Sequence, residues 1–242
     1  MQALERLLRI IEAVAAEPVG RTPTEVAAES HLSLSTTARI MIELAGEQII
    51  EKSELTGRYR LGDRLLRIVQ TSTGRLNDHE MLRELMTSLR DLSGETVSLN
   101  VRIGAQRVCI ETVPSEQAVA RFIPVGQAQP LIDSSSGEVL LAALPDAELR
   151  GVLKLLPASS QEITELHRRL DQVRADGYAI HQGKLVAGVT GVAVPVPTFG
   201  SRSAALGVSG PLERFTLKEV HRVLPELIAV AKQISNIPRV GP

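Results

Sequence analysis

The side chains best suited to specific polar contacts lie in residues 34–46. Apolar residues recur at i, i+3, i+4 and i+7 from Thr37, which is the spacing of one buried helix face. The opposite face carries Ser35, Thr36 and Arg39. Hydroxyls can bond phosphates, and an arginine can bind a guanine edge through two parallel hydrogen bonds. We therefore predict a DNA-reading helix in which Arg39 contacts a base.

The residues before this helix predict a first helix and a sharp turn. Thr22 suits the N-cap, Pro23 the first helical position, and Glu25 completes a capping box with Thr22. The helix is expected to break at residues 30–31, and Ser33 then caps the DNA-reading helix. Together these features predict a helix-turn-helix.

A short β-hairpin is expected next, with strands near residues 49–50 and 58–61 around a Thr56-Gly57 turn. Its two arginines are predicted to face outward, as a wing lying along a DNA backbone requires. The expected DNA contacts are Thr22, Thr24, Ser33, Ser35, Thr36, Arg39, Arg58 and Arg60.

The predicted DNA-binding part has no excess of positive charge. Residues 1–75 contain 10 basic and 10 acidic side chains, and the whole chain has a net charge of -1. Affinity for DNA must then come from local placement of cations and from more than one copy on the site.

An amphipathic helix is predicted over residues 3–16, before the helix-turn-helix. Its buried face is expected to be formed by Leu4, Leu7, Leu8, Ile11 and Val14. Ile10 falls off this stripe, so we expect it to be exposed, either as an ordinary surface residue or in a dimer contact.

The amino-acid composition limits the classes of protein to which the chain can belong. The chain has 242 residues, 43% of them hydrophobic, which is enough for two domains. One cysteine, no long apolar run and a charged N-terminus predict a cytoplasmic protein that does not enter a membrane. Only 2% of the residues are aromatic, which argues against base stacking with single strands or RNA.

The rest of the chain predicts a second, α+β domain. A linker helix is expected over residues 63–77. It is followed by a second helix whose buried face is expected to include Met81 and Leu92. Alternating patterns predict an antiparallel sheet, and a final amphipathic helix closes the domain. The expected strands cover residues 96–101, 107–113, 119–123, 178–181, 188–196 and 204–209.

A run of small residues, Ser134, Ser135, Ser136 and Gly137, leads into an apolar helix expected over residues 139–144. Free amides and hydroxyls at a helix start form a seat for a carboxylate or another anion. The alternative, an ordinary serine-capped helix, stays open on the sequence alone.

Taken together, the chain resembles the IclR family of transcriptional regulators. The resemblance rests on ALERLLRIIEAV, LSLSTTARIMIEL, GRYRLG, SSSGEVLLAAL, DGYAI, GVTGVAVPV and ALGVSGP, in this order. It implies a winged helix-turn-helix (1–62), a linker helix (63–77) and a GAF-like effector domain (78–242). It also implies dimers, often paired into tetramers, that bind double-stranded DNA at inverted repeats and respond to a small metabolite.

The resemblance adds His181, Gly191, Gly207 and Ser209 to the serine run as expected effector contacts. The sequence departs from the family pattern at several of these positions. In the expected pocket, Glu138 stands where the family usually has a lysine, and His181 stands where it commonly has an acidic residue. Gly191 stands in place of a common cysteine, and Gly207 in place of a serine. Ahead of the DNA-reading helix, Ser33-Leu34 stands in place of a Pro-Lys pair. The two glycines are expected to enlarge the cavity, so a bulkier or less hydroxylated ligand than the usual small acid is predicted.

No catalytic residue, cofactor or metal site is predicted, because the five histidines are scattered and no Gly-rich phosphate loop is present. Two alternatives remain on the sequence. The chain could be a metabolite-binding protein or enzyme whose helix-turn-helix serves protein contacts, or a redox sensor acting through Cys109.

Overall fold

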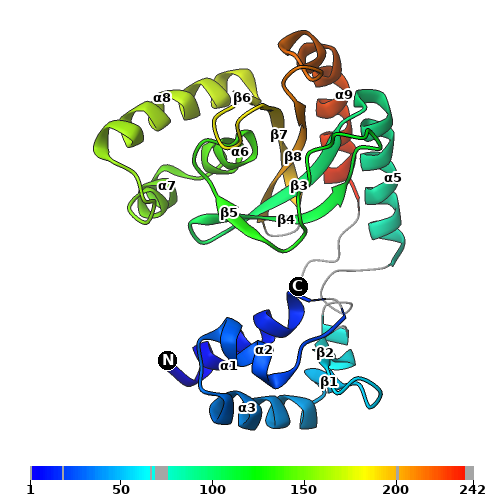
Figure 1. The fold of residues 1–242 in the computed structure, drawn as a ribbon. Coiled ribbons are helices and arrows are strands. Elements are labelled where there is room, and N and C mark those ends of the chain that lie inside the picture. The colour runs from blue at the N-terminus through cyan, green and yellow to red at the C-terminus, as the bar shows by residue number, and fades with distance from the viewer. Residues whose placement is uncertain (1, 18, 66, 69–75, 200–201, 238–242) are drawn as a thin grey trace. The chain divides into compact units, whose positions relative to one another are not determined.

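The first of two units spans residues 1–74 of the computed structural model, which describes residues 2–17, 19–65, 67–68, 76–199 and 202–237. It contains the helices α1, α2 and α3 and a two-stranded antiparallel sheet, labelled in Figure 1. Their bounds are α1 Gln2–Ala15, α2 Pro23–Ser30, α3 Leu34–Gly46, β1 Ile50–Lys52 and β2 Tyr59–Leu61. The predicted helix-turn-helix and wing are confirmed.

Local capping fixes the turn between α2 and α3. Thr22 and Glu25 form the predicted capping box, with the Glu25 carboxylate accepting from the Thr22 amide at 2.7 Å. The hydrogen bond from the Thr22 amide is the main reason that the pKa of Glu25 is lowered; the Thr22 hydroxyl and the Arg58 guanidinium add to this effect, and burial opposes it. His31 ends α2 in the left-handed region (φ 55°), and Ser33 caps α3. The sharp turn follows from these two residues.

The buried face of α1 differs from the prediction. Ile10 is fully buried with Val14 in the core of the unit, whereas Leu4 and Leu8 are exposed. Positions 7, 10, 11 and 14 also follow helical spacing, so two overlapping apolar stripes exist on this helix. Packing against α2 and α3 selects the stripe that contains Ile10, which excludes the expected surface role for this residue.

Residues 63–65 and 67–68 of the predicted linker helix are helical. Residues 66 and 69–75 of that prediction lie outside the described residues. Residues 76–77 already belong to the first helix of the second unit, which spans residues 75–241.

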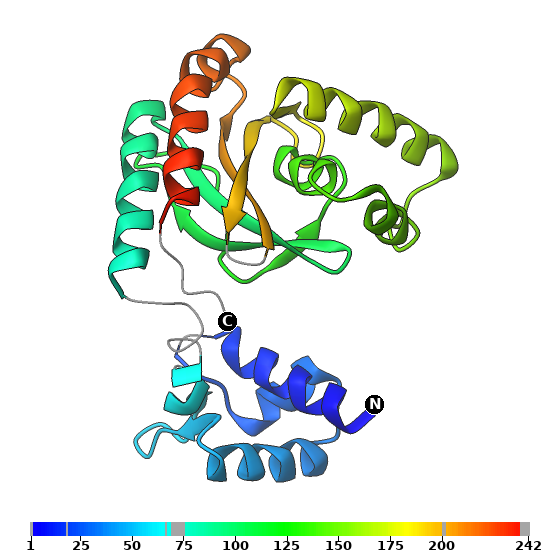
Figure 2. The same ribbon diagram turned by 180° about the vertical axis from the view of Figure 1, so that it is seen from behind.

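The second unit is a six-stranded antiparallel sheet with helices on both faces (Figures 1 and 2). The strand order is β5-β4-β3-β8-β7-β6. The strands are β3 Thr96–Ile103, β4 Gln106–Val113, β5 Ala128–Pro130, β6 Ala179–Gln182, β7 Val189–Phe199 and β8 Arg202–Pro211. The helices are α5 Leu76–Ser93, α6 Ser135–Ala142, α7 Asp146–Leu153, α8 Ser160–Asp176 and α9 Leu217–Ser235.

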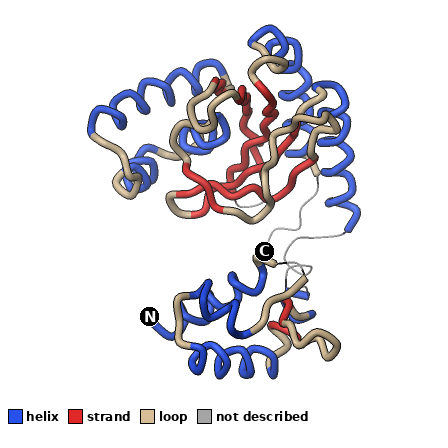
Figure 3. Tube along the Cα trace, in the orientation of Figure 1, coloured by secondary structure: helices blue, strands red, loops and turns tan. Residues whose placement is uncertain are grey.

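Two hydrophobic cores lie on the two faces of this sheet. Helices α5 and α9 cover one face, and α6, α7 and α8 lie on the other (Figure 3). In α5, Met86 and Leu89 are buried, but Met81 and Leu92 are exposed, contrary to the prediction. The α+β architecture with an antiparallel sheet is confirmed.

The strand expected over residues 119–123 does not form. Side chains take the carbonyl groups that a strand would need: Thr96 Oγ1 donates to the Arg121 carbonyl at 2.8 Å, and Arg214 donates to the Val119 carbonyl at 2.9 Å. Arg214 is itself held by a bidentate contact with the buried Glu95. The strand in this part of the chain is β5, after the loop.

A buried carboxylate, Glu138, connects three elements of the second unit. Its two oxygens lie 2.5 Å from Arg169 Nε on α8 and 2.8 Å from His181 Nε2 on β6. Burial alone would raise the pKa of Glu138, but the hydrogen bonds and charges of these two partners outweigh burial and lower it. The carboxylate therefore joins α6 to both neighbours as an anion.

Because Gly137, next to Glu138, has no side chain, the first turn of α6 can pack closely against the preceding loop. A Cβ at this position would fall well inside contact distance of the Leu131 carbonyl. Gly151, on α7 of the same unit, has nothing within 4 Å of such a Cβ.

We expect Gly137→Ala to lower the free energy of unfolding by about 2–3 kcal/mol, because the backbone that the new methyl group would meet cannot move aside without strain. Gly151→Ala should change it by less than about 1 kcal/mol. Urea unfolding of both variants checks this, and equal stabilities would contradict it.

The Glu138 network predicts a pH-dependent stability. The carboxylate has a folded pKa below its ordinary value of 4.5, so its stabilisation is present above that pH and is lost as the pH falls toward the folded pKa. Glu138→Gln should cost about 3 kcal/mol at pH 7, because the Arg169 guanidinium and the His181 ring lose the anion against which they pack. Urea unfolding should show that this difference shrinks below pH 4.5. A difference that stays constant from pH 7 to pH 3 would rule out the ionic role.

Candidate functional site

The exposed face of α3 brings together half of the predicted DNA contacts. Ser33, Ser35 and Thr36 form a hydroxyl cluster at the start of the helix, in which Ser33 Oγ lies 3.2 Å from Ser35 Oγ and donates to Thr36 Oγ1 at 2.8 Å. The Arg39 side chain is 72% exposed and lies one turn further along, 3.2 Å from Glu43. The predicted buried stripe of α3, including Thr37 and Met41, is confirmed.

The two wing arginines differ. Arg60 is exposed and pairs with Glu51 on the neighbouring strand. Arg58 turns back to the domain: its Nε donates to the Gly20 carbonyl at 2.8 Å, and its terminal nitrogen pairs with Glu25 at 2.8 Å. The expectation that both arginines face outward therefore holds for Arg60 only, because the capping-box carboxylate holds Arg58.

Two further predicted DNA contacts, Thr22 and Thr24, lie at the start of α2 and have different roles from the hydroxyl cluster of α3. Thr22 is engaged in the capping box, and Thr24 is exposed on the first turn of α2. Thr24 is thus free for a phosphate contact, whereas the Thr22 hydroxyl already donates to Glu25 at 3.1 Å.

Ion pairs explain the charge balance of the first unit. Six arginines among its described residues each pair with a carboxylate of the same unit. These paired arginines are Arg9, Arg21, Arg39, Arg58, Arg60 and Arg64, with Glu5, Glu29, Glu43, Glu25, Glu51 and Glu47 respectively. Most of these pairs are exposed, so each is weak and can exchange its carboxylate for a phosphate.

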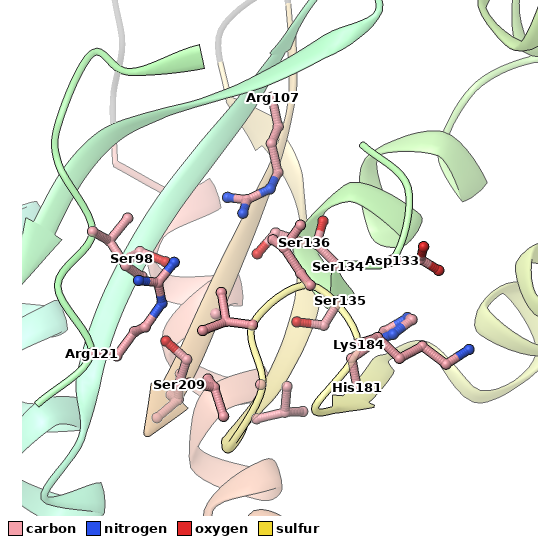
Figure 4. A pocket seen from close by; sticks show the side chains of 18 residues that line it. Ser98, Arg107, Arg121, Asp133, Ser134, Ser135, Ser136, His181, Lys184 and Ser209 are labelled. Carbon is pink, nitrogen blue, oxygen red and sulfur yellow. The ribbon is translucent and has the colours of Figure 1, made fainter. Parts of the chain in front are cut away.

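A cavity of about 530 Å³, counted with its part open to solvent, lies between α6 and the sheet of the second unit (Figure 4). Its polar lining is Ser98, Arg107, Arg121, Asp133, Ser134, Ser135, Ser136, His181, Lys184 and Ser209. The remaining lining is Ile123, Leu185, Val186, Val189, Gly191, Val192, Gly207 and Val208.

Seven of the eight predicted effector contacts line this cavity. The exception is Gly137, which faces the loop at Leu131 as described above. Helix α6 begins at Ser135, earlier than predicted, and Ser134 Oγ caps it by accepting from the Gly137 amide at 3.1 Å. The serine run is therefore both a helix cap and a cavity wall.

The two sheet glycines allow α6 to approach the sheet. A Cβ at Gly191 would lie 3.2 Å from Ser135 Oγ, and one at Gly207 would lie 3.1 Å from Ser136 Oγ. The space above the glycines is thus taken by the two serine hydroxyls. The prediction that these glycines enlarge the cavity is wrong at this point.

Arg107 on β4 is a buried cation without a carboxylate partner among the described residues. One terminal nitrogen donates to Asn100 Oδ1 at 3.0 Å and the other to Gln129 Oε1, while Nε has no partner. Burial, with a smaller contribution from the positive charge of Arg121, lowers the pKa of Arg107 to about 10. At neutral pH the guanidinium stays charged, so the cavity contains a cation that lacks an anion.

Asn100 connects this cation to the α6 serines. Its Nδ2 donates to Ser98 Oγ at 3.0 Å and to Ser136 Oγ at 3.4 Å. A β-bulge between Leu99 and Asn100 interrupts the register of β3 and β4 at this point. Bulges of this kind commonly re-aim side chains beside binding sites.

Two further polar atoms at the cavity have no hydrogen-bond partner in the described structure. One is Ser209 Oγ on β8 and the other is His181 Nδ1. Since His181 Nε2 faces Glu138, its Nδ1 is the ring atom left for a ligand. Figure 4 places His181 and Ser135 at one end of the cavity and Arg121, Ser98 and Ser209 at the other.

Sequence reasoning missed Ser98, Arg107 and Arg121. Ser98 alternates with the buried Val97 and Leu99 in β3, and this pattern is also produced by a strand whose polar side meets water. Arg107 lies on the buried side of β4, where a charged residue is not expected from the sequence. These residues are far from the serine run in the sequence, so nothing in the sequence indicated that they lie beside it in the fold. The pairing of β3 with β8 brings Ser98 next to Gly207 in register.

Other chemistries find little support in the described residues. Cys109 is buried, its Sγ donates to the Glu111 carbonyl at 3.2 Å, and burial raises its pKa to about 11, which argues against a redox-sensing thiolate. The described part of the chain contains no group of three metal-ligating side chains. None of its helices is long and apolar enough to cross a membrane.

Comparison with known proteins places both units in one family. The model of the IclR helix-turn-helix domain matches residues 3–54, and that of the bacterial transcriptional regulator IclR C-terminal domain matches residues 70–236. The HTH-type transcriptional repressor AllR of Klebsiella pneumoniae is 30% identical over 225 residues, which are 89% of this chain and 82% of the repressor. The regulator XynR of Escherichia coli is 29% identical over 216 residues, 86% of each chain.

Solved structures agree with this assignment. An IclR homologue from Microbacterium hydrocarbonoxydans, complexed with 4-hydroxybenzoate, superposes with a TM-score of 0.78 at 26% identity, covering 96% of this chain and 97% of its own. An IclR regulator from Alicyclobacillus acidocaldarius has the same fold, with a TM-score of 0.77 at 23% identity, covering 97% of this chain and 98% of its own. The chain therefore belongs to the IclR family and is a ligand-responsive, DNA-binding transcriptional regulator.

Proposed function

We propose that the protein acts as a homodimer, or as a pair of dimers, that binds an inverted-repeat operator through α3 and the wing. The contacts expected to matter most are Arg39 to a base, Arg60 to the backbone, and the hydroxyls of Ser33, Ser35 and Thr36 to phosphates. The balanced charge of the first unit supports two copies, because one copy offers few free cations. Arg58 and Thr22 serve the fold in this proposal.

The effector is a small organic anion, with its carboxylate at Arg107 and Arg121. The observation that carries this assignment is the buried Arg107 guanidinium with its unpartnered Nε. A carboxylate would supply the missing counter-charge and accept from that nitrogen. The apolar side chains at residues 123, 185 and 192 suit the carbon skeleton of such a ligand. This assignment departs from our expectation of a ligand unlike a small acid.

His181 gives the other end of the ligand a polar partner. With Nε2 facing Glu138, Nδ1 can accept from a ligand hydroxyl, or donate to a ligand oxygen when the ring is protonated. The 4-hydroxybenzoate held by the Microbacterium homologue has an acid and a hydroxyl at opposite ends. A hydroxylated or keto acid therefore fits this cavity best.

A hydrolase-like reading of the same site has less support. Glu138 and His181 beside Ser135 resemble the acid, base and nucleophile of a triad. However, His181 Nδ1 has no hydroxyl partner among the described residues, so no serine is activated. The site binds a ligand without turning it over in this proposal.

Selection of genomic fragments by the purified protein at two salt concentrations tests the DNA-binding proposal. Enrichment of a short inverted repeat is expected. Arg39→Ala should lose about tenfold or more in affinity and relax the preference at one position of each half-site, because a bidentate base contact is removed. Arg168→Ala, an exposed arginine of α8, is the matched control. Unchanged affinity and preference in Arg39→Ala would show that another residue reads the base.

Isothermal titration with paired acids and amides tests the effector proposal. 4-Hydroxybenzoate and other small acids should bind more tightly than their neutral amides. Arg107→Gln or Arg121→Gln should weaken the acid by about tenfold or more, because a charge-assisted contact is lost. Arg168→Gln should leave it unchanged. Equal binding of acid and amide would contradict the anionic assignment.

A further inference from the structure

One of the two cations of the effector cavity lies on a loop without helix or strand. Residues 114–127 connect β4 to β5, and Arg121 in this loop lines the cavity. Figure 4 shows Arg121 with Ser98 and Ser209, at the end of the cavity away from His181. Because no ladder or helical hydrogen bonds fix the backbone of the loop, other contacts must hold Arg121 in its place.

The fully buried hydroxyl of Thr96 on β3 holds the loop at two points. Its Oγ1 donates to the Arg121 carbonyl at 2.8 Å and accepts from the Ser115 amide at 3.1 Å. Ser115 in turn donates through its own hydroxyl to the Gly94 carbonyl at 2.6 Å. Thr96 precedes Ser98 by two residues on the strand, so both side chains lie on the cavity side of the sheet. One hydroxyl thus joins the start and the middle of the loop to the sheet.

Arg214, in the turn after β8, holds the loop at a third point, two residues before Arg121. Its terminal nitrogen donates to the Val119 carbonyl at 2.9 Å. The guanidinium is itself fixed by the bidentate contact with Glu95, which is 1% exposed and directly precedes Thr96. A bidentate pair restricts the orientation of a guanidinium, so the loop is bound here to a fixed point of the domain.

These contacts keep Arg121 in the same cavity as a second cation. Arg107 also lines the cavity, and its pKa is lowered first by burial and then by the charge of Arg121. Two guanidinium groups in one partly buried site repel each other. An unattached loop could relieve this repulsion by moving Arg121 toward water. The bonds from Thr96 and Arg214 oppose that movement, because they fix the loop backbone on both sides of the Arg121 side chain.

We propose that Thr96 and Arg214 are positioning residues for the effector. They hold the 114–127 loop so that the guanidinium groups of Arg121 and Arg107 contact one carboxylate. This inference rests on the proposed anionic effector. Neither positioning residue lines the cavity, so neither is expected to contact the ligand. An acid should therefore depend on them more than a neutral ligand of the same shape, because only the acid gains from the charge of Arg121.

Isothermal titration of Thr96→Val with 4-hydroxybenzoate and 4-hydroxybenzamide tests the inference. Valine keeps the shape of threonine but removes both hydrogen bonds to the loop. We expect the dissociation constant of the acid to rise about fivefold and that of the amide to change by less than about twofold. Thr96→Ser, which keeps a hydroxyl, should restore the wild-type ratio of the two constants. Thr190→Val is the matched control, because Thr190 is a fully buried strand residue that does not line the cavity.

A double-mutant cycle separates positioning from a general structural effect. If Thr96 acts through Arg121, Thr96→Val should change the affinity for the acid little when Arg121→Gln is already present. Arg214→Lys is a second variant that does not depend on the first. Lysine keeps a cation for Glu95 but lacks the planar fork, so the Val119 carbonyl should lose its donor and the preference for the acid should fall.

The inference is overturned by any of three results. If Arg121→Gln weakens binding of the acid while Thr96→Val and Arg214→Lys keep the wild-type ratio, the loop needs no such anchors, although the anionic effector stands. If the effects of Thr96→Val and Arg121→Gln on the acid add in full, Thr96 does not act through Arg121. If the wild-type protein does not prefer the acid to the amide, the proposed effector assignment fails and the inference fails with it.

Discussion

The effector cavity depends on the close packing of the α6 N-terminus against the sheet. Gly191 and Gly207 leave room for the hydroxyls of Ser135 and Ser136, and Gly137 leaves room for the Leu131 carbonyl. Glu138 then binds Arg169 on α8 and His181 on β6, which holds the helix to both elements. The first amides of α6 and its serines are thereby held at fixed positions along one wall. A side chain at any of these glycines would move that wall and change the cavity with it.

Arg107 differs from the exposed arginines of the first unit. In the first unit, exposed arginines are paired with carboxylates, so the surface is neutral until DNA competes for them. In the second unit, Arg107 is buried with neutral partners, Asn100 and Gln129, and keeps its charge uncompensated. Burying a charge without an anion is costly, so the proposed anionic effector would stabilise the unit by supplying the counter-charge of Arg107.

Much of the first unit and half of the cavity could be predicted from the sequence, because their signals are local. The capping box, the buried stripe of α3 and the serine run each lie within a few residues of one another. The errors came where tertiary packing decides. Ile10 belongs to one of two overlapping stripes on α1, and only the contact with α2 and α3 selects it. Residues 119–123 had a strand-like pattern, but distant side chains, those of Thr96 and Arg214, occupy their carbonyls.

The pair formed by Glu138 and His181 has a consequence for any attempt to redesign this wall. The family resemblance implies a lysine and an acidic residue at these two positions, so the polarity of the contact is reversed here. A lysine placed at position 138 alone would meet the Arg169 guanidinium and the His181 ring in a buried site, where like charges are costly. Positions 138 and 181 must therefore be changed together.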